Sequence, residues 1–110
     1  MSLPLHQSLC TASKVVRSDG PVWFHGIWMK MAQAAASGQT VGLVASGTSG
    51  TWTESKVIVP KQVITSATFR TEWSELMNVG AMSGIHCTDG LWVYLPKIAA
   101  GGSTVVIVWS

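Results

Sequence analysis

Short β-prone segments separated by turn signals make up this chain, and their spacing limits its fold more than any other feature. Asp19-Gly20-Pro21 and Thr88-Asp89-Gly90 are turn sequences, because glycine adopts positive φ readily and proline fixes φ near the value of a turn. Several short strands at such spacing are typical of β-sandwiches and barrels. The 110 residues suffice for one domain. We predict an all-β, single-domain β-sandwich, jelly-roll-like, with about seven or eight short antiparallel strands.

Alternating apolar side chains place the individual strands. The segment 22–31 carries apolar residues on both faces, which is the pattern of a central strand covered on two sides. The segment 56–59 is followed by Pro60, and proline either ends a strand or places it at a sheet edge. The remaining predicted strands are 14–18, 39–45, 62–70, 85–87, 91–95 and 103–109.

Three segments fall outside the strand pattern. Met1–Ser13 shows neither helical period nor strand alternation, so we expect an extended N-terminal arm over 1–13 and the β-sandwich domain over 14–110. Ala32–Ala36 resembles a helix start that Ser37-Gly38 stops within about one turn. Thr71–Met77 is ambiguous, because its residues also suit one or two helical turns.

The composition indicates a surface with few charges. Hydrophobic residues make up 47% of the chain and charged residues 11%, against about 25% charged residues in an average protein. Either small polar residues or partner subunits must therefore cover the outside. The net charge of +2 is small and the Lys and Arg residues are scattered, which argues against nucleic acid as a partner.

Neither a membrane span nor secretion is expected. The most apolar stretch, 21–36, is interrupted by His25, Lys30 and Gln33 and is shorter than a spanning helix. The segment 1–9 contains no Lys or Arg, unlike a signal peptide, so we expect synthesis in the cytoplasm. Cys10 and Cys87, the two cysteines, are then expected as reduced thiols.

No residue pattern for catalysis, metal binding or nucleotide binding emerges. Asp19 and Asp89 belong to turns, and nothing pairs the other acids as glycoside hydrolysis requires. His86 and Cys87 are adjacent, so on a strand they point to opposite faces and cannot easily share an ion. We expect His25 to be buried and hydrogen-bonded. The hypothesis is a non-enzyme without cofactor; a small hydrolase using Glu54, Glu72 or Glu75, or a metal protein, is a weaker alternative.

The six tryptophans suggest a binding surface as well as a core. We assign Trp109, and either Trp23 or Trp28, to core packing. Trp52 lies among Gly, Ser and Thr, where no core is predicted, so it either anchors on a partner or stacks on a ligand such as a sugar. The predicted partner interface consists of Leu3, Leu5, Leu9, Trp52 and Trp73.

Two parts of the chain resemble small virion proteins of tailed bacteriophages. One is Asp19-Gly20-Pro21-Val22-Trp23-Phe24-His25-Gly26-Ile27-Trp28; the other combines the hairpin Ser83–Tyr94 with the terminal strand Gly102–Trp109. Thr40-Val41-Gly42-Leu43 stands where the family has a central T-V-x-L strand, but Ala45-Ser46-Gly47 replaces the usual Asp-Gly after it. The resemblance covers most of 19–110, and its motifs are short and degenerate.

The resemblance implies a β-sandwich that decorates capsids as a cement protein, or a small β-module of a tail, and it carries over no catalytic residue. We therefore expect a structural virion protein, made in the host cytoplasm, that binds the major capsid protein or other virion subunits through apolar and aromatic contacts. A homo-oligomer is expected, and a closed trimer suits local threefold positions. The alternative is a carbohydrate- or receptor-binding β-module of a tail or spike that uses Trp52 or Trp73.

Overall fold

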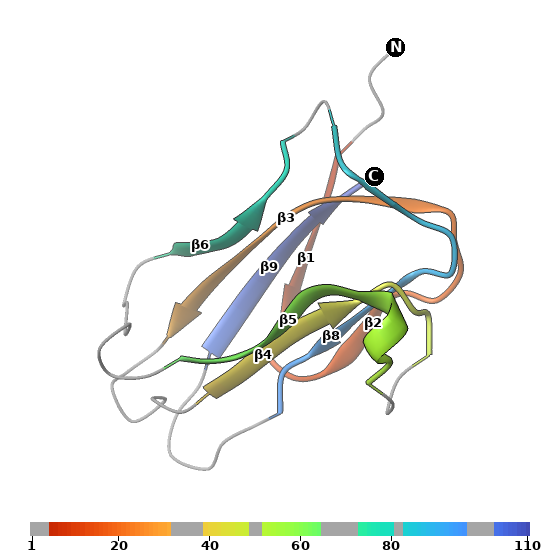
Figure 1. Ribbon diagram of the computed structural model, residues 1–110. Helices are drawn as coiled ribbons and strands as arrows, with labels where there is room; N and C mark the ends of the chain where they lie inside the picture. Colours follow the sequence, from red (N-terminus) through yellow and green to blue (C-terminus); the bar gives the residue numbers. More distant parts are fainter. Residues whose placement is uncertain (1–4, 32–38, 49–51, 65–72, 81–82, 97–102) are drawn as a thin grey trace.

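The computed structural model consists of two antiparallel β-sheets packed face to face (Figure 1). It describes residues 5–31, 39–48, 52–64, 73–80, 83–96 and 103–110. The strands are β1 (His6–Cys10), β2 (Lys14–Arg17), β3 (Val22–Met31), β4 (Gln39–Val44), β5 (Val57–Ile64), β6 (Ser74–Asn78), β7 (Ile85–Cys87), β8 (Leu91–Tyr94) and β9 (Ser103–Trp109), with one 3-10 turn, η2 (Glu54–Lys56), before β5.

The strand order is that of a jelly roll. The five-stranded sheet has the order β1-β9-β3-β6, with β7 also paired to β3, and the four-stranded sheet has the order β2-β8-β4-β5. The antiparallel pairs β1·β9, β2·β8, β3·β6 and β4·β5 are nested along the chain. A long hairpin rolled into two sheets gives this arrangement. The predicted all-β, jelly-roll-like sandwich is therefore confirmed.

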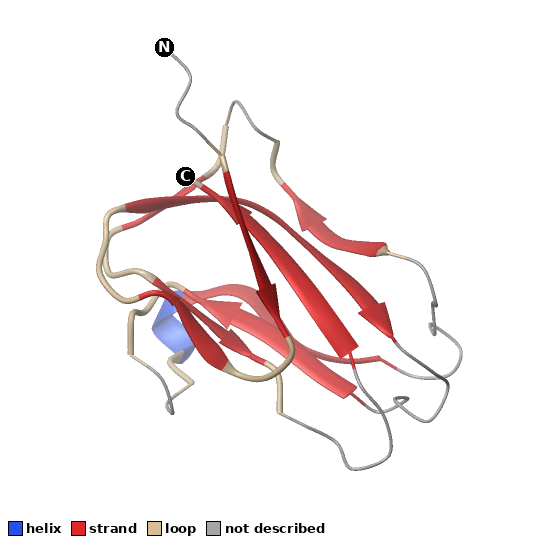
Figure 2. Cartoon of the chain, turned by 180° about the vertical axis from the view of Figure 1, so that it is seen from behind, coloured by secondary structure: helices blue, strands red, loops and turns tan. Residues whose placement is uncertain are grey.

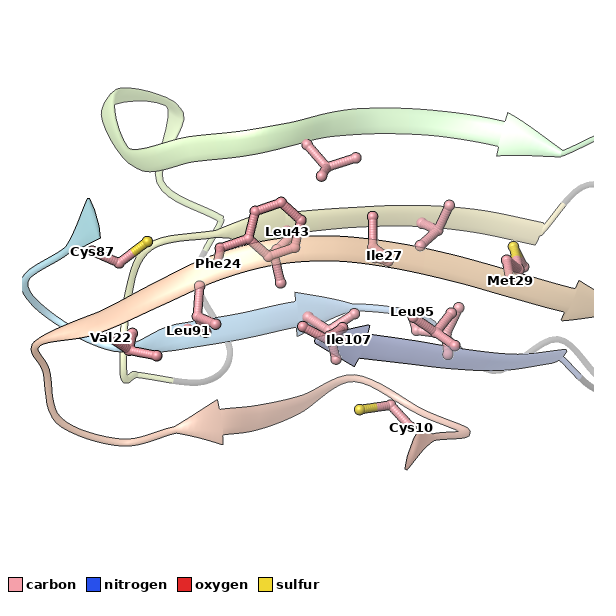
Figure 3. Packing of buried hydrophobic residues seen from close by; sticks show 14 residues of the cluster. Cys10, Val22, Phe24, Ile27, Met29, Leu43, Cys87, Leu91, Leu95 and Ile107 are labelled. Carbon is pink, nitrogen blue, oxygen red and sulfur yellow. The ribbon is translucent and has the colours of Figure 1, made fainter. Parts of the chain in front are cut away.

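The core lies between the two sheets, where alternate side chains of facing strands meet. Phe24 and Ile27 of β3 and Ile107 of β9 point inward and are fully buried, and Leu43 and Leu91 meet them from the other sheet (Figure 3). Burial of each such side chain contributes about 1.5–3 kcal/mol. Apolar packing between the sheets therefore holds the sandwich together.

Most predicted strands lie where the alternation put them. The bounds of β3, β7 and β9 agree with the prediction, and β2, β4 and β8 differ from it by one residue at the end. The segments 56–59 and 62–70 are not separate strands, because β5 runs from Val57 to Ile64 through Pro60. β5 is an edge strand, where a residue without an N–H is tolerated. The predicted strand residues 65–70 lie outside the described residues.

The expectations for the segments outside the pattern need correction. Residues 6–10 of the expected arm form β1, which pairs residue by residue with β9, so the sandwich begins before residue 14. Ser74–Asn78 is a strand beside β3 and not a helical turn. Pairing with a neighbouring strand overrode the helical propensity of Glu, Leu and Met there. The expected helix start at 32–36 lies outside the described residues.

A predicted turn joins β7 to β8. Gly90 has φ of 94°, a left-handed conformation that glycine adopts at little cost. A Cβ at this position would also collide with the backbone carbonyl oxygen of Arg17. The Asp89-Gly90 sequence thus lets this turn lie directly against the end of β2.

Candidate binding surface

The outer face of the five-stranded sheet, which faces away from the core, carries an open apolar groove. Its volume is about 450 Å³, and three strands and the residue before β6 line it with Gln7, Leu9, Trp28, Trp73, Val106 and Val108. The strand register explains the grouping, because Leu9 pairs with Val106 and Val106 pairs with Trp28 across adjacent strands. Strand residues two apart point to the same face, so the groove is a direct result of the pairing.

The indole of Trp28 lies along the sheet over Gly26. A Cβ built on Gly26 would stand 2.5 Å from the Cη2 atom of the Trp28 ring, which is too close for a real contact. The missing side chain at Gly26 therefore leaves the space that Trp28 occupies. Trp28 is half-buried, and its ring forms part of the groove.

The expectation that both faces of β3 are covered is wrong for the described part of the chain. The inner face packs in the core, but Trp28 on the outer face borders the groove, and Trp23 is 38% exposed and lies against His86. The assignment of Trp23 or Trp28 to the core is therefore wrong. Trp109 does pack against the core, donates a hydrogen bond from Nε1 to Ser8 Oγ and stacks on His6.

The structure brings two of the predicted interface residues together. Leu9, 63% exposed, and Trp73, 46% exposed, line the same groove although they lie far apart in the sequence. Leu5, 48% exposed, directly precedes β1. Leu3 lies outside the described residues.

Trp52, the remaining predicted interface residue, lies on the other sheet. A Cβ on Gly42 would stand 2.6 Å from its ring, and Tyr94 contacts the ring edge-on at 5.8 Å between centroids. The Lys61 ammonium lies 4.9 Å from the ring centroid, and Nε1 donates to Glu54 Oε1. Trp52 therefore lies over the outer face of the four-stranded sheet, against Tyr94 and Lys61, and does not line the groove.

His25 and the pair Lys56–Asp89 make contacts within the fold. His25 is buried and its two ring nitrogens lie 2.8 Å from the Gly80 carbonyl oxygen and from Ser110 Oγ, as predicted. Lys56 pairs with Asp89 at 2.7 Å on the surface, where such pairs contribute little. Within the described ranges no group of three or more His, Cys, Asp or Glu could hold a metal ion.

Both cysteines are free and buried. Burial raises the pKa of the Cys87 thiol to about 11, and its Sγ donates weakly to the Ile85 carbonyl oxygen. Burial also raises the pKa of Cys10, an effect that the charge of nearby Lys14 opposes. At neutral pH both groups are therefore protonated thiols and poor nucleophiles.

Sequence reasoning missed four residues of the groove: Gln7, Trp28, Val106 and Val108. Two signals point to them. Gly26 precedes Trp28 by two residues on the same strand face, which leaves room for an indole lying on the sheet. Both faces of β9 carry apolar residues. The face that does not pack in the core therefore requires either a cover or a partner.

No helix in the described residues is long and apolar enough to span a bilayer. Comparison of the chain with protein-family models, with curated proteins and with solved structures gives no match.

Proposed function

We propose that this chain is a structural virion protein of a tailed phage, which binds the major capsid protein or another virion subunit through the groove on its five-stranded sheet. The observation that carries the proposal is the outer face that the described residues leave open, on which Leu9, Trp28 and Trp73 line one apolar groove. The resemblance to small virion proteins and the jelly-roll topology, a fold shared by viral capsid domains, support the same function.

Binding of this kind requires burial and no chemistry. Exposed apolar patches of a monomer often mark sites of protein interaction, and aromatic side chains provide much of the energy of such interfaces. Each Å² of apolar surface removed from water contributes about 25 cal/mol before the costs of association. Glu75 pairs with Trp28 across the strands and Lys30 with Thr104, so the outer face carries one acid and one base beside the apolar residues.

The test is whether the chain is retained on particles. Virus particles are produced in cells that carry the viral genome encoding this chain and are purified on a density gradient. The amount of chain bound to the particles is then measured for wild type, Trp73→Ser and Leu9→Ser. We expect each substitution to reduce retention by about tenfold or more, as for a residue central to an interface. Val63→Ser is the matched control, because Val63 is 59% exposed, between Trp73 at 46% and Leu9 at 63%, but lies on the other sheet.

Two outcomes would contradict the proposal. The chain is not a virion component if wild type is absent from the purified particles. Another surface makes the contact if Trp73→Ser and Leu9→Ser are retained as well as Val63→Ser. Thermal unfolding of each variant checks that a loss of retention does not come from a loss of fold.

One observation favours carbohydrate as the ligand instead. Trp28 and Trp73 line the same groove, together with the amide of Gln7, and sugars stack on indole rings while amides bond their hydroxyls. A glycan array with wild type and Trp73→Ser separates the two functions. Binding of a defined glycan that Trp73→Ser abolishes would favour the β-module of a tail or spike.

A further inference from the structure

The outermost strands differ in how they are protected against pairing with another chain. β2 carries Lys14 and Arg17 and has a register shift in its pairing with β8. β5 carries Pro60 and Lys61 and has two register shifts against β4. On the far side of β3, β6 carries Glu75 beside a register shift, and β7 has three residues. Charges, prolines, bulges and short length are the usual means of blocking edge-to-edge association.

β1 has none of these features. All five residues, His6–Cys10, pair with β9 in unbroken register, and the strand contains no proline and no Lys, Arg, Asp or Glu. In the described part of the chain no strand pairs with the edge of β1 that faces away from β9. Figure 2 shows β1 running along the near side of the molecule. Its outer backbone N–H and C=O groups are therefore available to another strand.

We propose that β1 pairs antiparallel with β1 of a second copy of this chain, so that the two five-stranded sheets join into one sheet across a twofold axis. An identical copy always brings identical charges, and like charges opposite one another destabilise strand pairs. In a pair aligned over its full length, β2 would set Lys14 opposite Arg17 of the other copy, and β5 and β6 would each bring a second copy of Lys61 or Glu75 into the pair. β1 contains no Lys, Arg, Asp or Glu and pairs in unbroken register, so it meets both requirements of self-pairing.

The free edge of β1 is better suited to pairing with a second copy of this chain than with a strand of another protein. Recognition of a foreign strand by edge addition depends on pockets for its alternate side chains, and of the residues that line the groove only Gln7 and Leu9 belong to β1. A second copy needs no such selection, because two identical regular edges match in length. Pairing centred on Ser8 puts Gln7 of each copy beside Leu9 of the other on the outer face, where Leu9 still lines the groove.

This geometry has a consequence for attachment, which rests on the proposed function. In a continuous sheet the twofold axis runs perpendicular to the sheet, so the outer faces of both copies point the same way. Both grooves would then face one target surface. Two linked sites bind a surface more tightly than one, since the second contact forms at high effective concentration.

The test measures self-association of the purified full chain by sedimentation velocity over a wide range of concentration. We expect a monomer–dimer equilibrium for wild type. Gln7→Lys introduces a charge at both ends of the new strand pair and should raise the dimer dissociation constant about tenfold. Val63→Lys, on the protected edge strand β5, should leave the dissociation constant unchanged. Circular dichroism confirms that both variants remain folded.

Amide hydrogen exchange locates the contact. At high concentration we expect slower exchange for residues 6–10 and no change for β5. The inference is overturned by a monomer at every concentration, by a trimer, by a dimer that Gln7→Lys leaves intact, or by unchanged exchange in β1. None of these outcomes concerns retention on particles, so failure of this inference and failure of the proposed function are distinguishable.

Discussion

Gly26 and Gly42 have the same role on opposite sheets, because each leaves the space in which a tryptophan ring lies along the strands. We predict that Gly26→Ala displaces the Trp28 indole and deforms the groove, since a flexible side chain yields before the backbone does. The readout is the Nε1–H signal of each indole in a ¹H–¹⁵N NMR spectrum, together with retention on particles.

Gly42→Ala is the matched control for that experiment. It should shift the Trp52 signal, leave the Trp28 signal in place and leave particle retention unchanged, because Trp52 lies on the four-stranded sheet. A loss of retention with Gly42→Ala equal to that with Gly26→Ala would mean that the groove is not the contact.

Cys87 makes stability depend on alkaline pH. Burial raises the pKa of its thiol to about 11 in the folded chain from an ordinary value of 9.0, so the folded state holds the proton more tightly than the unfolded state. The contribution to stability is fully present below pH 9.0 and is lost as the pH rises towards 11, by about 1.4 kcal/mol per pH unit at most. Urea unfolding at pH 8 to 11 should show a smaller decline for Cys87→Ala than for wild type. Equal declines in the stability of the two proteins would contradict the raised pKa of Cys87.

At the scale of the element, β9 has two faces with different roles. Ile107 is fully buried in the core, whereas its neighbour Val108 is half-buried and borders the groove. We predict that Ile107→Ala lowers the free energy of unfolding by about 2–5 kcal/mol through the cavity it leaves, and that Val108→Ala lowers it by less than about 1 kcal/mol. Urea unfolding measures both. Similar losses for the two variants would mean that the outer face is covered.

The elements that could be predicted are those whose own sequence specifies a strand. β3 is bounded by Pro21 and rich in aromatic and β-branched residues, so local preference and sheet position agree. β1 reads His-Gln-Ser-Leu-Cys, which has no β-branched residue and no alternation. It becomes a strand because β9 supplies a register for it, and a contact so distant in sequence leaves no local signal.

At the scale of the whole molecule, sequence could indicate that strands carry a second apolar face but not which face lies outside the core. β3 and β9 are apolar on both faces, and alternation alone cannot decide which face is covered. The packing of the two sheets settles this for the described residues, since Ile27 and Ile107 meet the second sheet and Trp28 does not. The same packing moves Trp52 away from Leu9 and Trp73, which no spacing in the sequence could reveal.

The position of β9 between β1 and β3 also determines when this chain can finish folding during synthesis. Residues 6–10 are synthesised before the other described strands, but their partner strand follows only on the order of 5–20 s later, at about 5–20 residues per second. Until then both edges of β1 are open, and the five-stranded sheet has a gap in its middle rather than at its side. The sandwich is therefore completed in one late step, when the last strand fills that gap and holds the first strand in place.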